Sequence, residues 1–352
     1  MKSLLYVQTG EVFPQSSLNK ISSLAHSIES GDDLIDISYI ATKLHRRMGY
    51  IIGAKEALQI LKRFEYRIDR FSRKDCVKLL QICSLSINRS MDSSQGEVSR
   101  ELIRLRCSIV TEIIKKLESR CEHFSTNEIG VVISALSRMF EHHMISFIFT
   151  LCDILKARTL HILESPEAST PSIFLSRSEL HRVIPFALLG LQQNGLPLPE
   201  SFVRASIELF SIPYLSEVPY QHLSLYVFVV SGSRFPESRF IVEYALDRIA
   251  DSADDMTVLD VARIGSGAIT FDKSLATRVA KHVNFAIPRK KTESDVHGVL
   301  ALVRCVCECE KPISRRLAHK MAEMIHKVRR SLPKDYLMEI EHRVSGMNKE
   351  GS

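Results

Sequence analysis

The amino-acid sequence predicts an all-α protein, built as an α-solenoid of about seven helix-pair repeats. Two observations carry this prediction: a helix-start motif recurs along the chain, and a stripe of apolar residues follows each copy at helical spacing. A third observation is that no segment between the copies shows the two-residue alternation that is typical of a β-strand.

The recurring motif is a small capping residue, an acid three positions later and an apolar residue directly after the acid. A capping oxygen accepts a hydrogen bond from an unpaired backbone N–H, and the acid lies against the positive end of the helix dipole. The motif therefore predicts the first turn of a helix. Copies begin at Asp33, Ser72, Ser125, Ser176, Thr257 and Thr292, and a degenerate copy begins at Pro219.

The residues four, seven, eight and eleven positions after each cap are apolar or small. In the copy that begins at Ser125 they are Ile129, Val132, Ile133 and Leu136. This spacing places them on one face of an α-helix. Because all copies keep the same register, we expect one buried first helix per copy.

A second helix is expected after each first helix. Its seven predicted ranges are 54–67, 97–121, 145–162, 199–210, 236–250, 273–287 and 313–329. Loop sequences at 90–96 and 164–171 lengthen two copies, and without them the period is about 36–40 residues. The predicted organisation is an N-terminal segment with a capping helix over 1–32, the solenoid over 33–330, and a short helix and tail over 331–352.

This repeat resembles the heptatricopeptide repeat. The likeness is carried by Phe124-Ser-Thr-Asn-Glu-Ile-Gly-Val-Val-Ile-Ser-Ala-Leu136 and by Asp36-Ile-Ser-Tyr-Ile-Ala41, and it covers residues 33–330. It is similar to the helical regions of organellar proteins related to the Fas-activated serine/threonine kinase group. It is also similar to repeat subunits of the RNA-editing substrate-binding complexes of protist mitochondria. The resemblance implies RNA binding in mitochondrial RNA processing, stability or ribosome assembly.

Capped amphipathic helix pairs also occur in armadillo, HEAT and tetratricopeptide proteins, although the Trp, Gly, Tyr and Pro pattern of the tetratricopeptide repeat is missing here. Many relatives in the resembled group end in a small nuclease-like domain. Only residues 331–352 follow the last predicted pair, so we expect no nuclease.

The composition and motifs favour a binding protein over an enzyme. Apolar residues make up 45% of the chain and charged residues 25%, and no apolar run is long enough to span a membrane. The phosphate-binding, zinc-protease and serine-hydrolase motifs are missing, so we expect no enzyme and no cofactor. The first 28 residues contain serines, lysines and a single acid, Glu11, a composition that hints at mitochondrial import. Import segments also favour arginine, and the first arginine here is Arg46, so the alternative location is the cytoplasm.

The eight cysteines are predicted to be reduced, small apolar residues. Cys305-Val-Cys307-Glu-Cys309 could offer soft ligands one helical turn apart, but a second such pair is missing and Cys307 falls on the apolar stripe. Buried thiols are therefore expected rather than a metal site. Gly265-Ser-Gly267 lies inside a predicted first helix and is expected to allow close helix packing.

Positive charge is concentrated in two blocks. Residues 43–78 hold 11 Lys/Arg and 4 Asp/Glu, and residues 273–334 hold 15 Lys/Arg and 5 Asp/Glu. Such blocks attract phosphates through a long-range field that salt screens. The candidate RNA-binding residues of the first block are Lys43, Arg46, Arg47, Lys62, Arg63, Arg67, Arg70, Arg73 and Lys74. Those of the second block are Arg289, Lys290, Lys291, Arg315, Arg316, Lys320, Lys327 and Arg330.

The predicted partners are single-stranded or ribosomal RNA, and protein subunits of a larger ribonucleoprotein complex. The alternative is a structural adaptor, such as an accessory subunit of a mitochondrial ribosome, whose contacts are mainly to proteins. The lack of Trp makes base stacking a less obvious mode of recognition. Solvated helix faces also carry such charges, so the position of the basic side chains decides between these functions.

Overall fold

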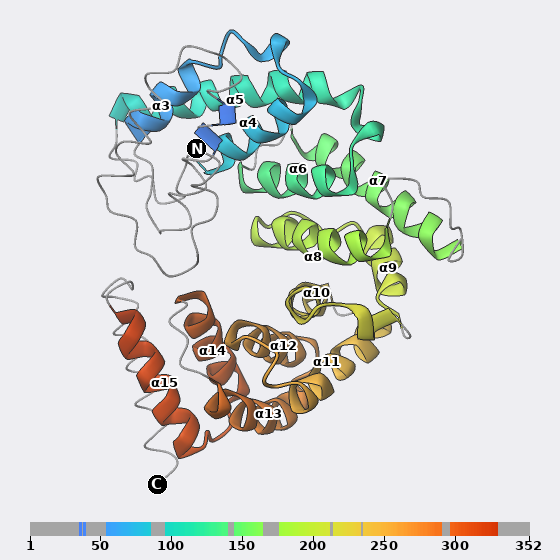
Figure 1. Cartoon of the computed structure of the whole chain (residues 1–352), viewed down its shortest axis with the longest axis vertical. Helices are drawn as coiled ribbons and strands as arrows, with labels where there is room; N and C mark the ends of the chain where they lie inside the picture. Colours follow the sequence, from blue (N-terminus) through green and yellow to red (C-terminus); the bar gives the residue numbers. More distant parts are fainter. Residues whose placement is uncertain are drawn as a thin grey trace. The chain divides into compact units, whose positions relative to one another are not determined.

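The computed structural model describes residues 35–36, 38–39, 54–85, 96–139, 144–164, 176–211, 214–233, 235–290 and 296–329. Over these ranges the regular structure is entirely helical, with thirteen α-helices, α3 to α15, and no β-strand (Figure 1). The prediction of an all-α protein is confirmed. None of the described helices combines the length and the apolar character that crossing a membrane requires.

The chain divides into two compact units, residues 1–154 and 155–352. The first unit contains α3 (Ala54–Lys62), α4 (Arg73–Leu85), α5 (Gly96–Glu118) and α6 (Thr126–Met139), and the boundary falls inside α7 (Ile145–Glu164). In this unit α3 packs on α5, and α4 packs on both α5 and α6.

The second unit contains eight further helices. They are α8 (Arg177–Gln193), α9 (Glu200–Leu209), α10 (Tyr220–Val230), α11 (Arg239–Asp251), α12 (Val258–Phe271), α13 (Ala276–Arg289), α14 (Val296–Cys309) and α15 (Arg315–Val328). The first helices pack on one another in chain order: α8 on α10, α10 on α12, and α12 on α14 (Figure 1). The second helices follow the same rule, because α11 packs on α13 and α13 packs on α15.

The apolar stripes form the core as predicted. In α6, Ile129, Val132, Ile133 and Leu136 are completely buried, and the corresponding residues of α4, α8, α10 and α12 are buried as well. At the C-terminal copy the stripe is weaker, because Leu300 is only half-buried.

The predicted helix starts are confirmed at five copies, where α4, α6, α8, α10 and α12 each begin directly after the expected cap. At Thr257 the box is reciprocal: the Asp260 N–H donates to the threonine Oγ1 over 3.1 Å, and the Thr257 N–H donates to the aspartate carboxylate over 3.1 Å. Ser125 and Glu128 form the same pair over 3.2 and 2.8 Å. The predicted caps Asp33 and Thr292, the capping helices predicted at the two ends, and the two lengthening loops lie outside the described residues, apart from Gly96 and Glu164 at the loop edges.

The second helices differ from the predicted ranges at their ends. α3 ends at Lys62 and is followed by a turn and a 3₁₀ segment at Ile68–Arg70, and the predicted starts at 236 and 273 are 3₁₀ turns that lead into α11 and α13. Such tight turns are common at helix ends and share the apolar spacing of the helix they join, so the sequence pattern does not separate them.

A buried pair of apolar residues comes before each of four first helices, and the sequence analysis missed it. One member stands directly before the cap and the other three positions earlier, across a tight turn. An apolar residue before the cap packs against the first turn of the helix and fixes the direction of the entering chain. The pairs are Ile68 and Phe71, Cys121 and Phe124, Leu215 and Val218, and Ala253 and Met256.

In three repeats, a Lys or Arg at the end of the second helix closes the repeat: it donates hydrogen bonds to groups at the start of the first helix. The Lys116 ammonium on α5 donates to the carbonyls of Ile68, Asp69 and Phe71 over 2.9, 2.7 and 2.7 Å. A lysine has three N–H donors, so these carbonyls use all of them. Lys290, which follows α13, donates to the Met256 carbonyl, and Arg248 on α11 donates to the Tyr220 hydroxyl.

The two glycines of α12 lie where neighbouring helices come closest, as predicted. A Cβ at Gly265 would lie 2.5 Å from the Cys305 Sγ of α14 and 3.0 Å from a methyl group of Val279. A Cβ at Gly267 would lie 3.0 Å from a Val227 methyl group and 3.1 Å from the Val227 carbonyl oxygen on α10. Both glycines therefore set the spacing between α12 and its neighbours.

Candidate anion-binding surface

The first basic block contributes exposed cations, but several of them are paired. Arg67, Arg70 and Lys74 are exposed, and Arg63 is half-buried. Lys62 is half-exposed, and its Nζ lies 2.6 Å from a Glu101 carboxylate oxygen on α5. Lys43, Arg46 and Arg47 lie outside the described residues.

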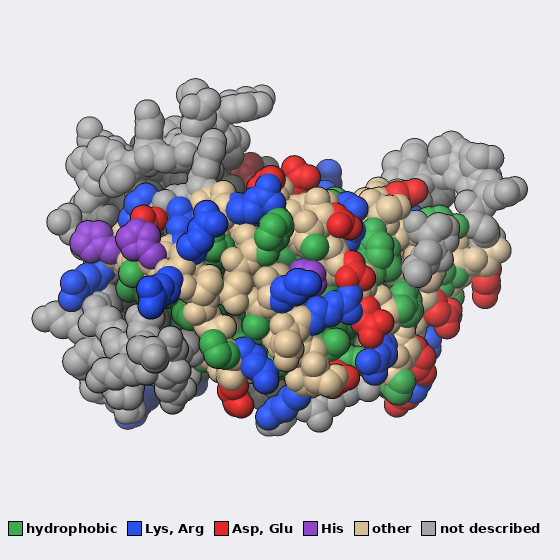
Figure 2. All heavy atoms as spheres, turned by 90° about the horizontal axis from the view of Figure 1, so that it is seen from below, with side chains coloured by type: hydrophobic (Ala, Val, Ile, Leu, Met, Phe, Trp, Pro, Cys, Tyr) green, Lys and Arg blue, Asp and Glu red, His purple; other side chains and the backbone are tan. Residues whose placement is uncertain are grey.

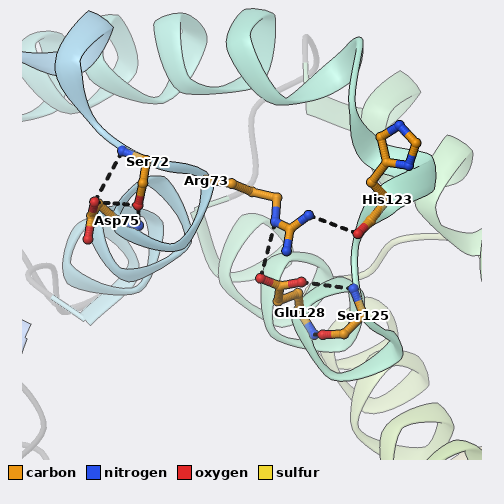
Figure 3. Close-up of polar contacts among 6 residues, drawn as sticks. All are labelled: Ser72, Arg73, Asp75, His123, Ser125 and Glu128. Atoms are coloured by element: carbon orange, nitrogen blue, oxygen red, sulfur yellow. Dashed lines mark hydrogen bonds and ion pairs between the residues drawn. The ribbon is translucent and has the colours of Figure 1, made fainter. Parts of the chain in front are cut away.

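The Arg73 side chain forms contacts with other residues of the protein (Figure 3). Its Nε lies 3.3 Å from a carboxylate oxygen of Glu128, the acid that caps α6, and its Nη1 donates to the His123 carbonyl over 2.8 Å. Its guanidinium also lies over the Phe124 ring, 5.6 Å from the centroid. Arg73 therefore joins the start of α4 to the start of α6, and its donors face protein groups.

Arg177 occupies the same position as Arg73, directly after a cap. Its guanidinium lies 3.4 Å from the centroid of the Tyr214 ring, in the turn before α10. The arginine that follows a serine cap thus contacts the turn before the next first helix in both units. This role gives a second reason to treat Arg73 as structural.

The second basic block places three cations on α13, over residues 276–289, which contain no acid. Lys281 and Arg289 are exposed and Arg278 is half-buried. Arg278 pairs with Asp247 of α11, and the Arg289 Nη2 lies 3.5 Å from the Asp254 carboxylate.

The ionisation of His282 follows from its place on α13. Burial lowers the pKa of His282, and the neighbouring Arg278 charge lowers it further. The histidine is therefore mainly neutral near pH 7, and the charge of α13 comes from its lysine and arginines.

Lys290 does not contribute to this surface. It is 8% exposed, and its ammonium donates to the Met256 carbonyl. The prediction that Lys290 binds RNA was wrong, because a run of basic residues gives no sign of which side chain turns inward. Lys291 and Arg330 lie outside the described residues.

α15 carries its charges on the side away from the core. Leu317, Met321, Met324 and Val328 are buried, as predicted for the apolar stripe, and Ile325 joins them. The exposed cations of this helix are Arg315, Arg316 and Lys327, with His319 and His326 beside them.

Lys320 is less available than its neighbours on α15. Its side chain is 15% exposed, and its Nζ lies 3.5 Å from the Glu323 carboxylate. Arg316, Lys320 and Lys327 share one side of the helix by their spacing, with Glu323 among them.

α13 and α15 lie side by side and form one surface, which we call the α13–α15 surface. The Ser314 N–H before α15 donates to the Asn284 side chain on α13 over 2.7 Å. Asp247 and Asp254 meet α13 from the α11 side, so the acids lie at one border of the surface. Figure 2 views the elements lowest in Figure 1: Lys and Arg spread across this face, whereas Asp and Glu gather mainly on its right half.

Phe285 is a feature of this surface that the sequence analysis missed. It lies on α13 between Lys281 and Arg289 and is 48% exposed, with the Arg289 guanidinium 4.8 Å from its ring centroid. The signal was present in the sequence: the spacing that buries Val279 and Val283 turns Phe285 toward solvent.

The cysteines of the described ranges form no disulfide, and those ranges hold no group of three or more His, Cys, Asp or Glu residues placed to bind a metal. Burial raises the pKa of the Cys76 thiol to about 11. Cys305 and Cys309 are buried, whereas Cys307 is half-buried. The prediction that Cys307 lies on the buried stripe was therefore wrong. At the end of α14 the buried face consists of Cys305, Val306 and Cys309 instead.

Comparison with known proteins adds no family assignment. No family model matches the chain, and no curated protein matches it. The geometry of the α13–α15 surface is therefore the main guide to function.

Proposed function

We propose that this protein is a helical-repeat solenoid that binds RNA through the α13–α15 surface and has no catalytic activity of its own. The observation that carries the proposal is the charge balance of the two helices. Together they hold seven Lys or Arg residues and a single acid, Glu323, over 276–289 and 315–328. Asp247 and Asp254 pair with Arg278 and Arg289, and Glu323 pairs with Lys320, so Lys281, Arg315, Arg316 and Lys327 supply most of the excess positive charge. A surface with such an excess attracts a polyanion and releases its counterions.

The packing order of the helices supports the solenoid part of the proposal. In the second unit each first helix packs on the next first helix, and the second helices from α11 to α15 do the same. Repeats of this kind contact mainly their neighbours and present long, continuous faces. A long face suits a strand-like ligand better than a small molecule.

The decisive experiment is a salt titration of binding to single-stranded RNA by the full chain. The variant replaces Arg315, Arg316 and Lys327 with alanine, because these are the predicted RNA-binding residues of α15 that are exposed. Each lost phosphate contact on a single strand lowers the slope of log affinity against log salt by about 0.7, so the slope should fall by about 2. The fold should persist because the buried stripe is untouched.

A matched control removes the same charge from another surface. Arg100, Arg104 and Arg120 are exposed in the first unit, and their triple alanine variant should keep most of the slope. Equal flattening by both variants would show that net charge alone drives binding. Absence of RNA binding by the parent chain at low salt would overturn the proposal and favour the adaptor function.

We also propose a mitochondrial location, which rests on the resemblance of the repeat and on the composition of the first 28 residues. The test is import of the full chain into isolated mitochondria, with protection from added protease as the readout. A chain that stays accessible to protease would contradict the location without touching the RNA-binding proposal.

A further inference from the structure

We infer that Phe285 is a stacking platform for an unpaired base, so that the α13–α15 surface accepts single-stranded RNA in preference to duplex RNA. This inference rests on the proposed RNA-binding function and deepens it, because it adds the form of the RNA. A duplex buries its bases in the stack and offers them only at its ends, whereas an unpaired base presents a π-face to an aromatic side chain.

The side chain of Phe285 is accessible to a ligand. Phe285 keeps 48% of its surface exposed although the Arg289 guanidinium covers part of it from 4.8 Å. Nearly half of the residue's surface therefore stays accessible with the guanidinium in place. A guanidinium over an aromatic ring strengthens the platform, because it can itself stack on a base or bind a phosphate.

Positive charge flanks the Phe285 ring along α13. Lys281 lies one turn before Phe285 and Arg289 one turn after it, so the three side chains share one side of α13. A base stacked on the ring would therefore have a cation on either side along the helix. Single surface aromatics are common and need no function, so this arrangement carries the inference rather than the exposure alone.

The other exposed aromatics have different surroundings. Phe186 on α8 is also 48% exposed, but its ring meets the edge of His222 at 6.0 Å instead of a guanidinium. Tyr66 is 89% exposed and lies among Arg63, Arg67 and Arg70, but Glu65 and Asp69 stand in the same stretch, whereas α13 contains no acid. Among the exposed aromatics that the structure describes, Phe285 is the one whose helix supplies cations and contains no acid.

The chain offers a clean spectroscopic test because it contains no Trp. Phe285→Trp would place a single fluorophore at the platform, and stacking of a base on the indole quenches its emission. The matched control is Phe186→Trp, which has the same starting exposure. We expect single-stranded RNA to quench the Trp at 285 and to leave the Trp at 186 nearly unchanged; equal quenching at both positions would overturn the inference.

The affinity test uses Phe285→Ala, a surface change that leaves the core intact. Loss of one stacked base should weaken binding to single-stranded RNA by roughly 5- to 150-fold. Binding to duplex RNA and to inorganic polyphosphate should change by less than about twofold, because these ligands make phosphate contacts without stacking. Phe285→Trp should restore the affinity for single strands.

These experiments distinguish failure of base stacking on Phe285 from failure of RNA binding by the α13–α15 surface. If the parent chain binds RNA with a steep salt slope but Phe285→Ala binds single strands as tightly as the parent, the platform is wrong and the phosphate surface stands. If the parent chain binds no RNA, both fail. A parallel loss of affinity for polyphosphate would show that Phe285 only shapes the helix, which also contradicts stacking.

Discussion

At the scale of single residues, the most restrictive positions are the glycines of α12. A methyl group at Gly265 would overlap the Cys305 sulfur, and one at Gly267 would press on the methyl and carbonyl groups of Val227, which would have to move by a few tenths of an ångström. The sequence predicted this role, because two glycines inside an apolar helical stripe are costly unless they allow close packing. The identity of the neighbouring atoms could not be predicted, because it depends on how α14 is rotated against α12.

Gly265→Ala should lower the free energy of unfolding by about 1–3 kcal/mol, because the added methyl group forces α12 and α14 apart. Cys305→Ala removes the nearest atom, so the double variant should recover part of the loss. The measurement is chemical denaturation of the single and double variants.

The control for this prediction is Gly232→Ala. There the added Cβ meets only the end of the Gln192 side chain, which can move away, so the stability should change little. A Gly265→Ala variant as stable as the control would show that α12 has more room than the structure indicates.

Other residue positions were not predicted from the sequence. Lys290 and Cys307 lie at or near helix ends, where a small error in register changes the side of the helix. Lys320 lies within α15, but its exposure depends on how that helix packs. Residues in the middle of the first helices were predicted correctly because several apolar neighbours fix their register together.

At the scale of helices, the starts were predictable and the connections were not. A cap and an acid three residues later are a local signal, so α4, α6, α8 and α12 begin where the sequence indicated. The buried pairs before the caps, such as Ile68 and Phe71, gain their role from contacts with other helices. Their spacing of three residues resembles an ordinary helical turn, so the sequence alone did not distinguish them.

The bond between Arg73 and Glu128 should couple α4 to α6. A double-mutant cycle with Arg73→Ala and Glu128→Gln measures this coupling, because glutamine keeps an acceptor for the Ser125 N–H and removes the charge. The matched control is the cycle of Lys62 and Glu101, an inter-helix pair in the same unit.

The Arg73 cycle should give the larger coupling energy. Its side chains are 32% and 15% exposed, compared with 51% and 47% for Lys62 and Glu101, and exposed pairs contribute only about 0–1 kcal/mol. Equal values from the two cycles would show that the Arg73 bond adds nothing beyond an ordinary surface pair.

At the scale of the whole molecule, the sequence predicted one continuous repeat over 33–330, whereas the contacts divide the chain into units of residues 1–154 and 155–352. The two basic blocks fall in different units: 43–78 in the first and 273–334 in the second. A charge count along the sequence cannot predict which block stays exposed, because that depends on carboxylates and carbonyls that the fold brings near.

A destabilising substitution should loosen mainly the helices around it, because each helix packs mainly on its near neighbours. In the Gly265→Ala variant, hydrogen exchange should speed up in α10, α12 and α14 and change far less in α4 and α6. Mass spectrometry of peptic fragments measures this directly. An equal loss of protection in both units would mean that the chain unfolds as a single cooperative body.

The lysines that close the repeats have a chemical consequence of their own. An acylating reagent must reach the side-chain nitrogen of a lysine, and a nitrogen that donates hydrogen bonds to backbone carbonyls is held against the protein. Lys116 and Lys290 should therefore acylate slowly, while Lys281 and Lys327 react at the rate of solvent-exposed amines. A reactivity profile of the lysines in the native protein thus separates the cations that hold the helices together from those that are open to a ligand.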